Sequence, residues 1–158
     1  MIRVGIGYDS HRFAPPGPLV LGGVSIVSDV HLAGHSDGDA VAHAVTDAIL
    51  GAAAAGDIGE MFPDTDAKNA RRNSLDMLRH AVARISTSGW HVLQVDVVVV
   101  TEQPRIGPHR EAMRAALAAA LGVKPGEISI KGKSNEGMGW IGRGEGLACM
   151  VVATLTND

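Results

Sequence analysis

Asp9, His11 and His43 are the residues of this sequence best suited to hold a metal ion. Asp9 and His11 stand two positions apart in a segment that alternates like a β-strand, so both side chains point to one face, roughly 7 Å apart. His43 follows Asp39 by four residues on an expected helix, again on one face. One carboxylate and two imidazoles form a zinc site with its fourth position open, which favours a catalytic metal and therefore an enzyme.

The acidic residues around His35 and Ser36, in the string HSDGD, have two compatible interpretations. Asp37 and Asp39 can accept hydrogen bonds from the imidazoles and so orient them for a metal. They can also cap the helix that follows, by accepting from its free backbone amides.

A glycine-rich segment near the end of the chain suggests a second binding region. Residues 137–142 match the pattern GxGxxG, but the sequence predicts a strand after them and no helix, which argues against a dinucleotide site. Backbone amides here, with Arg143, favour phosphate oxygens instead. Ser134 and Glu136 add a hydroxyl donor and a carboxylate, and a carboxylate beside phosphate indicates a hard cation such as Mg²⁺. The alternative is ordinary turn glycines and a solvated acid.

Composition narrows the class of protein. The chain has 158 residues, which predicts one domain spanning 1–158. A net charge of −3 and only 3% aromatic residues argue against nucleic-acid binding. The start of the chain resembles a strand rather than a signal peptide, and no apolar run reaches membrane-spanning length, so we expect a cytoplasmic protein without a membrane partner. The single cysteine, Cys149, lies in an apolar run and is expected to be buried.

The elements expected around these residues form an α+β fold, with a single mixed sheet and helices packed on one face, in the order β-β-α-α-β-α-β-β. The expected strands are residues 2–9, 19–26, 92–101, 128–134 and 147–155. The expected helices are residues 39–54, 75–85 and 109–122. The acidic segment 57–69 shows no periodicity and is interpreted as a loop.

Several strings together give the chain a family resemblance. GYDSHRF, LGGVSI, HSDGDAVAHAVTDAILGAAAAGDIGEMFPDTD and GRGEG resemble, in order and spacing, the 2-C-methyl-D-erythritol 2,4-cyclodiphosphate synthases of the non-mevalonate isoprenoid pathway. The resemblance implies a homotrimer with active sites between subunits, each with one Zn²⁺ and one Mg²⁺ or Mn²⁺. It implies conversion of 4-diphosphocytidyl-2-C-methyl-D-erythritol 2-phosphate to the cyclic diphosphate and CMP.

The resemblance also implies roles for individual residues. Asp9, His11 and His43 correspond to zinc ligands, and Glu136 to the Mg²⁺ ligand. His35 and Ser134 correspond to catalytic residues that stabilise the transition state. Residues implied to bind substrate are Ser36, Asp57, Ile58, Gly59, Phe62, Pro63, Asp64, Thr65, Asp66, Thr101, Glu102, Gln103, Pro104, Arg105, Ile106, Gly107, Lys133, Asn135, Trp140 and Arg143. Of these, residues 101–107 would present backbone groups to the cytosine of a neighbouring subunit's substrate.

The chain departs from the family pattern at a few of these positions. Lys133, Ser134 and Asn135 stand where many members have a run of threonines. Ser134 keeps the hydroxyl, and Lys133 adds a positive charge near phosphate. Trp140 replaces a more usual Phe, and Gly107 replaces a larger apolar residue, so nucleotide fit or cavity size can differ while the reaction stays the same.

Two other functions use the same residues. A metal-dependent phosphohydrolase would need the same three ligands, with bound water as the nucleophile. A non-catalytic module for an isoprenoid diphosphate would need only the glycine-rich segment and Arg143, and it leaves the three-ligand set unexplained.

Overall fold

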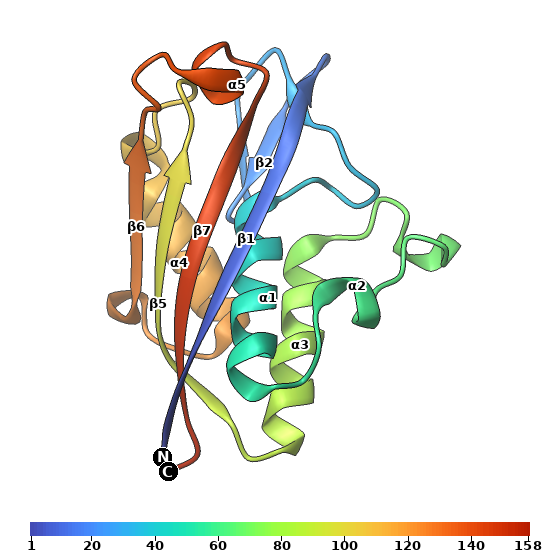
Figure 1. The fold of residues 1–158 in the computed structure, drawn as a ribbon, viewed down its shortest axis with the longest axis vertical. Coiled ribbons are helices and arrows are strands. Elements are labelled where there is room, and N and C mark those ends of the chain that lie inside the picture. Colours follow the sequence, from blue (N-terminus) through green and yellow to red (C-terminus); the bar gives the residue numbers. More distant parts are fainter.

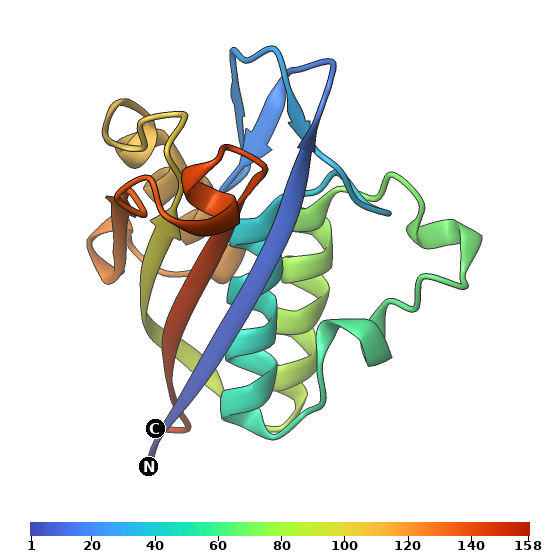
Figure 2. The same cartoon turned by 45° about the horizontal axis from the view of Figure 1, so that its top comes forward.

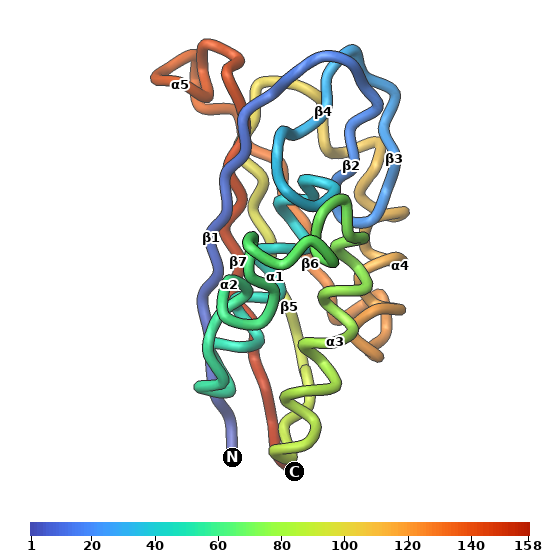
Figure 3. The backbone as a smooth tube through the Cα atoms, turned by 90° about the vertical axis from the view of Figure 1, so that its right-hand side faces the viewer, coloured from blue at the N-terminus to red at the C-terminus, as the bar shows by residue number.

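The protein has two layers, a twisted sheet and a row of helices against one of its faces. The computed structural model describes residues 1–158. Figure 1 shows the sheet face on, and Figure 3, turned by a quarter, shows the three long helices on one side of it. The sheet has five strands in the order β4-β1-β7-β5-β6. Only β5 and β6 run parallel, so the sheet is mixed, as the sequence predicts.

The bounds of the elements show where the prediction was accurate. The strands are β1 (Ile2–Ala14), β2 (Leu19–Leu21), β3 (Val24–Ile26), β4 (His31–Leu32), β5 (His91–Val100), β6 (Ile128–Lys133) and β7 (Gly146–Thr156). The helices are α1 (Ala40–Ala53), α2 (Ile58–Met61), α3 (Ser74–Thr87), α4 (Arg110–Leu121) and α5 (Gly139–Gly142). The long strands and the three long helices match the predicted segments to within a few residues.

The predicted second strand is wrong, because residues 19–26 form a separate two-stranded hairpin. Strands β2 and β3 pair with each other and not with the main sheet. Gly22 and Gly23 between them have φ angles of 58° and 76°. Two positive φ angles in a two-residue loop are the geometry of a tight hairpin turn, which glycine adopts without steric cost. The glycine pair therefore reverses the chain.

The predicted order of elements is also incomplete, because short helices lie in both segments interpreted as loops. α2 begins after Asp57 in the acidic segment, and Asp66 caps a single 3-10 turn over Ala67–Asn69. The glycine-rich segment contains α5. One turn of helix is too short to show a 3.6-residue period, so capping aspartates were the only available signal.

Helix α1 lies directly on the sheet because β1 faces the middle of it with two glycines, Gly5 and Gly7. A Cβ at Gly5 would lie 2.1 Å from the Ala48 carbonyl oxygen, and one at Gly7 would lie 1.9 Å from that of Ala44. Only glycine permits such close backbone approach. α1 is buried on nearly all sides, with α3 beyond it, and a single apolar core joins the sheet to the helices. The contact fixes the helix against the strand that carries Asp9 and His11.

The other face of the sheet carries none of the long helices. Val4, Ile6 and Tyr8 of β1 and Met150 and Val152 of β7 are all exposed there. Ile6 pairs with Val152 and Tyr8 with Met150 across the two strands, so these apolar side chains form one continuous patch. We call these five residues the outer patch. None of the helices is long and apolar enough to cross a lipid bilayer.

Candidate active site

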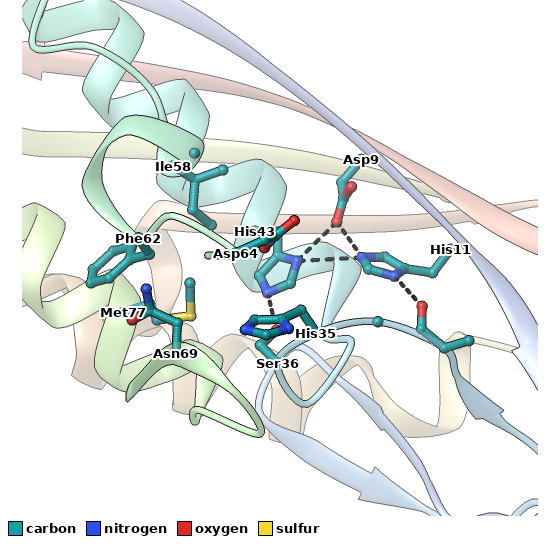
Figure 4. A pocket seen from close by; sticks show the side chains of 13 residues that line it. Asp9, His11, His35, Ser36, His43, Ile58, Phe62, Asp64, Asn69 and Met77 are labelled. Carbon is teal, nitrogen blue, oxygen red and sulfur yellow. Dashed lines mark hydrogen bonds and ion pairs between the residues drawn. The ribbon is translucent and has the colours of Figure 1, made fainter. Parts of the chain in front are cut away.

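Asp9, His11 and His43 meet at one point, as the sequence predicts. The Asp9 carboxylate oxygen Oδ2 lies 2.8 Å from Nε2 of His11 and 3.1 Å from Nδ1 of His43. The two imidazole nitrogens lie 3.3 Å apart (Figure 4). The three ligand atoms lie within 4.8 Å of one another, close enough to hold one metal ion. A carboxylate and two imidazoles suit Zn²⁺ among the common metals.

The start of α1 places His43 opposite the strand. Asp39 is the N-cap of the helix and accepts from the Ala42 backbone amide at 3.0 Å. The same carboxylate accepts from the amides of Gly22 and Gly23 at 2.8 and 2.7 Å. Complete burial raises the pKa of Asp39, and these backbone hydrogen bonds oppose the shift. Asp39 therefore joins the hairpin to α1. Its carboxylate accepts from these three amides, and the predicted hydrogen bond to an imidazole is wrong.

Each imidazole also has a hydrogen-bond partner at the ring nitrogen that faces away from the triad. Nδ1 of His11 lies 2.7 Å from the Ala33 carbonyl oxygen, which fixes that nitrogen as the proton donor. Nε2 of His43 lies 2.9 Å from Oγ of Ser36 and 2.8 Å from Oγ of Ser74. Asp37 accepts from Ser74, so it reaches His43 only through that hydroxyl. Sequence reasoning missed Ser74, because a serine at the start of a helix shows no sign of such a partner.

Electrostatics within the triad favour the ion-paired state when no metal is bound. Burial alone would raise the pKa of Asp9, but hydrogen bonds and charge attraction from His11 and His43 lower it overall. Burial alone would lower the pKa of His11, but the Asp9 carboxylate raises it overall. The ionised form of the Asp9 carboxylate, which is the form that binds a cation, is thus favoured.

A cavity of about 400 Å³ opens beside the triad. His35 and Ser36 enter it from the loop before α1, and Figure 4 shows both near the triad. Predicted site residues from the acidic segment that also line the cavity are Ile58, Gly59, Phe62 and Asp64. Figure 2 shows this segment as an arm reaching away from the helices.

Other predicted residues of the acidic segment have structural contacts instead. Asp57 accepts from the Glu60 amide and caps α2, and Asp66 caps the 3-10 turn through the Lys68 amide. Pro63 and Thr65 are exposed and lie outside the cavity lining.

Two residues that the sequence reasoning missed hold this arm in place. Asp47 lies four positions after His43 on α1, and its carboxylate accepts from the Ile58 amide at 2.8 Å. Burial raises the pKa of Asp47, and that hydrogen bond opposes the shift. The Asn69 side chain donates to the Pro63 carbonyl at 2.8 Å and lines the cavity. The four-residue spacing from His43 was the one available signal for Asp47.

A second cavity of about 530 Å³ lies at the ends of β5 and β6. All seven residues of the predicted cytosine segment, 101–107, line it, together with Lys133 and Ser134. Glu102 has an additional structural role, since its Oε1 accepts from the amides of Asn135 and Gly137 at 3.0 and 3.1 Å. The carboxylate thereby fixes both sides of Glu136, whose φ angle of 54° is unusual for a residue with a side chain.

The remaining predicted residues lie on or beside α5. Trp140 lines a third cavity with Ser10, Arg12 and His11. The exposed Arg143 donates to the Glu145 carboxylate at 2.7 Å, so in this state its charge is paired. Strand β7 lies between β1 and β5, and the first two cavities share no lining residue.

The chain is similar to known proteins over nearly its whole length. A 2-C-methyl-D-erythritol 2,4-cyclodiphosphate synthase of Gemmatimonas aurantiaca is 62% identical over 155 residues, covering 98% of this chain and 93% of that protein. The Plasmodium falciparum enzyme, solved as a CDP complex, is 34% identical, with a TM-score of 0.85 and coverage of 98% and 95%.

A fused relative shares the same fold. The bifunctional IspDF of Campylobacter jejuni is 39% identical, with a TM-score of 0.95, and the match covers 98% of this chain and 42% of the fused one. The profile of the YgbB family matches residues 2–156. The chain therefore belongs to the YgbB family, whose similar members bear the name 2-C-methyl-D-erythritol 2,4-cyclodiphosphate synthase.

Proposed function

We propose that this protein converts 4-diphosphocytidyl-2-C-methyl-D-erythritol 2-phosphate to 2-C-methyl-D-erythritol 2,4-cyclodiphosphate and CMP. The observation that carries the proposal is the Asp9–His11–His43 triad, which opens into one cavity with His35 and Ser36. Relatives across nearly the whole chain bear the name of this enzyme. A related structure contains CDP, which supports a cytidyl diphosphate as the ligand.

The reaction needs no nucleophile from the protein. An oxygen of the substrate's 2-phosphate forms a bond to the β-phosphorus, and the bond from that phosphorus to the bridging oxygen breaks. CMP leaves with that oxygen and its electron pair. A phosphate oxygen is already ionised at neutral pH, so the protein has to align two anions and offset their repulsion.

The donor atoms of the chain fit two kinds of cation. Asp9, His11 and His43 would hold Zn²⁺, and Glu136 would contribute one carboxylate to Mg²⁺ or Mn²⁺, which commonly take their remaining ligands from water and phosphate. When bound, such cations neutralise phosphate charge and polarise the phosphorus–oxygen bonds.

The side chains around the cavities would bind the different parts of the substrate. His35 and Ser36 would donate hydrogen bonds to the phosphate oxygens beside the triad. Ser134 would donate to the charge that develops during transfer, and Lys133 would attract the cytidyl phosphates. Residues 57–59, with the loop from Phe62 to Asp66, would enclose the methylerythritol part. Residues 101–107 would hold the cytosine, Asn135 would lie beside the phosphates, and Trp140 and Arg143 would lie near the diphosphate.

A homotrimer supplies the two halves of each site. The triad cavity and the cytosine cavity lie on opposite sides of β7 in one chain, which supports a site shared between neighbours. The outer patch supports self-association, since Val4 and Ile6 are 66% and 74% exposed. Burying such apolar area stabilises a closed oligomer.

Phosphorus NMR tests the proposed function directly. The substrate is incubated with the protein, Zn²⁺ and Mg²⁺, and its ³¹P spectrum is followed over time. We expect two mutually coupled diphosphate signals to appear together with CMP. CMP with two uncoupled monophosphate signals would instead show hydrolysis by water, and an unchanged spectrum would contradict both reactions.

A further inference from the structure

Nε2 of His43, the ring nitrogen that faces away from the triad, lies near two serine hydroxyls that differ in burial. Ser36 lines the triad cavity and is partly exposed, whereas Ser74 is fully buried at the start of α3 and does not line the cavity. The two Oγ atoms are 3.5 Å apart. Both lie within hydrogen-bond distance of the same nitrogen, Nε2 of His43.

The position of the proton on the His43 ring follows from the nitrogen on its opposite side, Nδ1. Nδ1 of His43 faces Asp9 and His11, so it must be unprotonated to hold a metal. A neutral imidazole then carries its proton on Nε2, where it donates outward. The Ser74 hydroxyl can accept that proton at 2.8 Å, because its own hydrogen is directed to the carboxylate of Asp37.

Asp37 holds Ser74 from two directions. Its Oδ1 accepts from the Ser74 hydroxyl, and its Oδ2 accepts from the Ser74 backbone amide at 3.0 Å. An ionised carboxylate only accepts, so the direction of the whole chain of hydrogen bonds is fixed. His43 therefore donates to Ser74, and Ser74 donates to Asp37.

We infer that Ser74 and Asp37 are positioning residues for the metal centre, which act on His43 and leave the Ser36 hydroxyl free for substrate phosphate. The inference rests on the metal site proposed above. A partner that fixes the tautomer and orientation of a ligating histidine typically changes metal affinity by about 10- to 100-fold. Ser36 faces the cavity, and when His43 donates to Ser74 instead, the Ser36 hydroxyl has no fixed partner and can turn toward phosphate.

Zinc affinity separates the roles of the two serines. We would measure the zinc dissociation constant of full-length Ser74→Ala, Ser36→Ala and wild-type protein by competition with a coloured chelator. Ser74→Ala should bind zinc about 10- to 100-fold more weakly. Ser36→Ala should keep the wild-type zinc affinity while losing turnover. The visible spectrum of the cobalt-substituted protein should change in Ser74→Ala and stay unchanged in Ser36→Ala.

Thr46→Val is the matched control. Thr46 is also fully buried, lies on the same helix as His43, and donates only to the Ala42 carbonyl. Removing its hydroxyl should leave both the zinc affinity and the cobalt spectrum of the protein unchanged. If Ser74→Ala does not fold, Asp37→Asn is tested instead; it removes the charge but keeps an acceptor oxygen, and should also weaken zinc binding.

The outcomes separate this inference from the proposed function. Wild-type protein that binds no zinc would contradict the metal site itself, and this inference with it. Wild-type protein that binds zinc, with Ser74→Ala or Asp37→Asn binding it equally well and showing the same cobalt spectrum, would overturn only the positioning role. Zinc affinity lost equally in Ser74→Ala and Thr46→Val would also overturn it, by indicating general destabilisation.

Discussion

His43 illustrates how much depends on single side chains in this protein. One ring nitrogen faces Asp9 and His11, and the other faces the hydroxyls of two serines, of which only Ser74 is buried. His11 is held in the same manner by a backbone carbonyl. Because both edges of both rings have partners, the nitrogens that would bind a metal are directed before it arrives, which lowers the cost of ordering them.

Replacing His43 by alanine should abolish zinc binding and turnover together. The variant keeps only Asp9 and His11 as ligands, and two ligands hold zinc far more weakly than three. Metal content by atomic absorption and CMP release should fall in parallel. His91→Ala, which removes an exposed histidine of β5, is the control and should retain both. A His43→Ala protein that is zinc-replete and fully active would refute the ligand assignment.

Zinc affinity should depend on pH through His11. Burial would lower the pKa of this imidazole, but the neighbouring Asp9 carboxylate raises it above its usual value. Zinc must displace that proton, so zinc affinity should fall as the pH falls, starting at a higher pH than for an ordinary histidine. Asp9 has a lowered pKa and stays ionised in this range.

Chelator competition at several pH values tests this dependence. The logarithm of the dissociation constant should change by about one for each pH unit below the pKa of His11. A constant affinity between about pH 6 and 8 would show that no proton competes at this histidine.

At the scale of elements, one carboxylate joins the β2–β3 hairpin to the helix that carries His43. Asp39 accepts three backbone hydrogen bonds, from Gly22, Gly23 and Ala42. It is fully buried, and its hydrogen bonds to the Gly22 and Ala42 amides are buried as well, so these two amides have no water as an alternative partner. The hairpin and α1 should therefore lose stability together when this carboxylate is removed.

Asp39→Ala should lower the free energy of unfolding by about 2–4 kcal/mol. The loss combines a missing helix cap with the amides of Gly22 and Gly23, which lose their acceptor, the first of them in a buried position. Urea unfolding followed by circular dichroism measures it. Asn73→Ala removes the exposed cap of α3 and should cost only about 1 kcal/mol. Equal losses in the two variants would show that the hydrogen bonds to the hairpin contribute little.

Elements with strong periodicity were predictable from the sequence, and short elements were not. The helix around His43 and the strands containing Asp9 and Val97 follow simple patterns of 3.6 and two residues. The hairpin at Gly22 was missed because a glycine pair was interpreted as an interruption of one strand. α2 has a single turn, and its contact with Asp47 is tertiary, so no local pattern could reveal it.

The candidate site likewise has one part that could be predicted from the sequence and one part that could not. The Asp9–His11–His43 triad could be predicted, because metal chemistry demands those residue types on one face. The hydrogen bonds of Ser74 to His43 and of Glu102 to Asn135 could not, because these partners lie 31 or more positions away along the chain and depend on how loops pack.

At the scale of the whole molecule, the uncovered face of the sheet is the dominant feature. The outer patch places Ile6 and Val152 side by side on a face that none of the long helices covers. The proposed trimer would bury this surface, and the energy gained is roughly proportional to the apolar area removed from water.

Ile6→Glu should therefore separate the subunits. A carboxylate in the middle of an apolar interface has to be desolvated without a partner, which strongly opposes association. Sedimentation velocity should show the wild-type chain as a trimer and the variant as a monomer with little activity. Val27→Glu is the control, since Val27 is fully exposed away from the sheet. A trimeric, active Ile6→Glu protein would show that this face is not the interface.

The position of β7 between the two cavities has a consequence in genetics. If one subunit supplies the triad and its neighbour supplies the cytosine segment, two null alleles can complement each other. A cell that expresses His43→Ala and a cytosine-segment null in equal amounts would assemble mixed trimers, each with one intact site. Random assembly of such trimers restores about a quarter of the wild-type activity. Two such alleles would therefore be lethal separately and viable together, wherever the product is essential for growth.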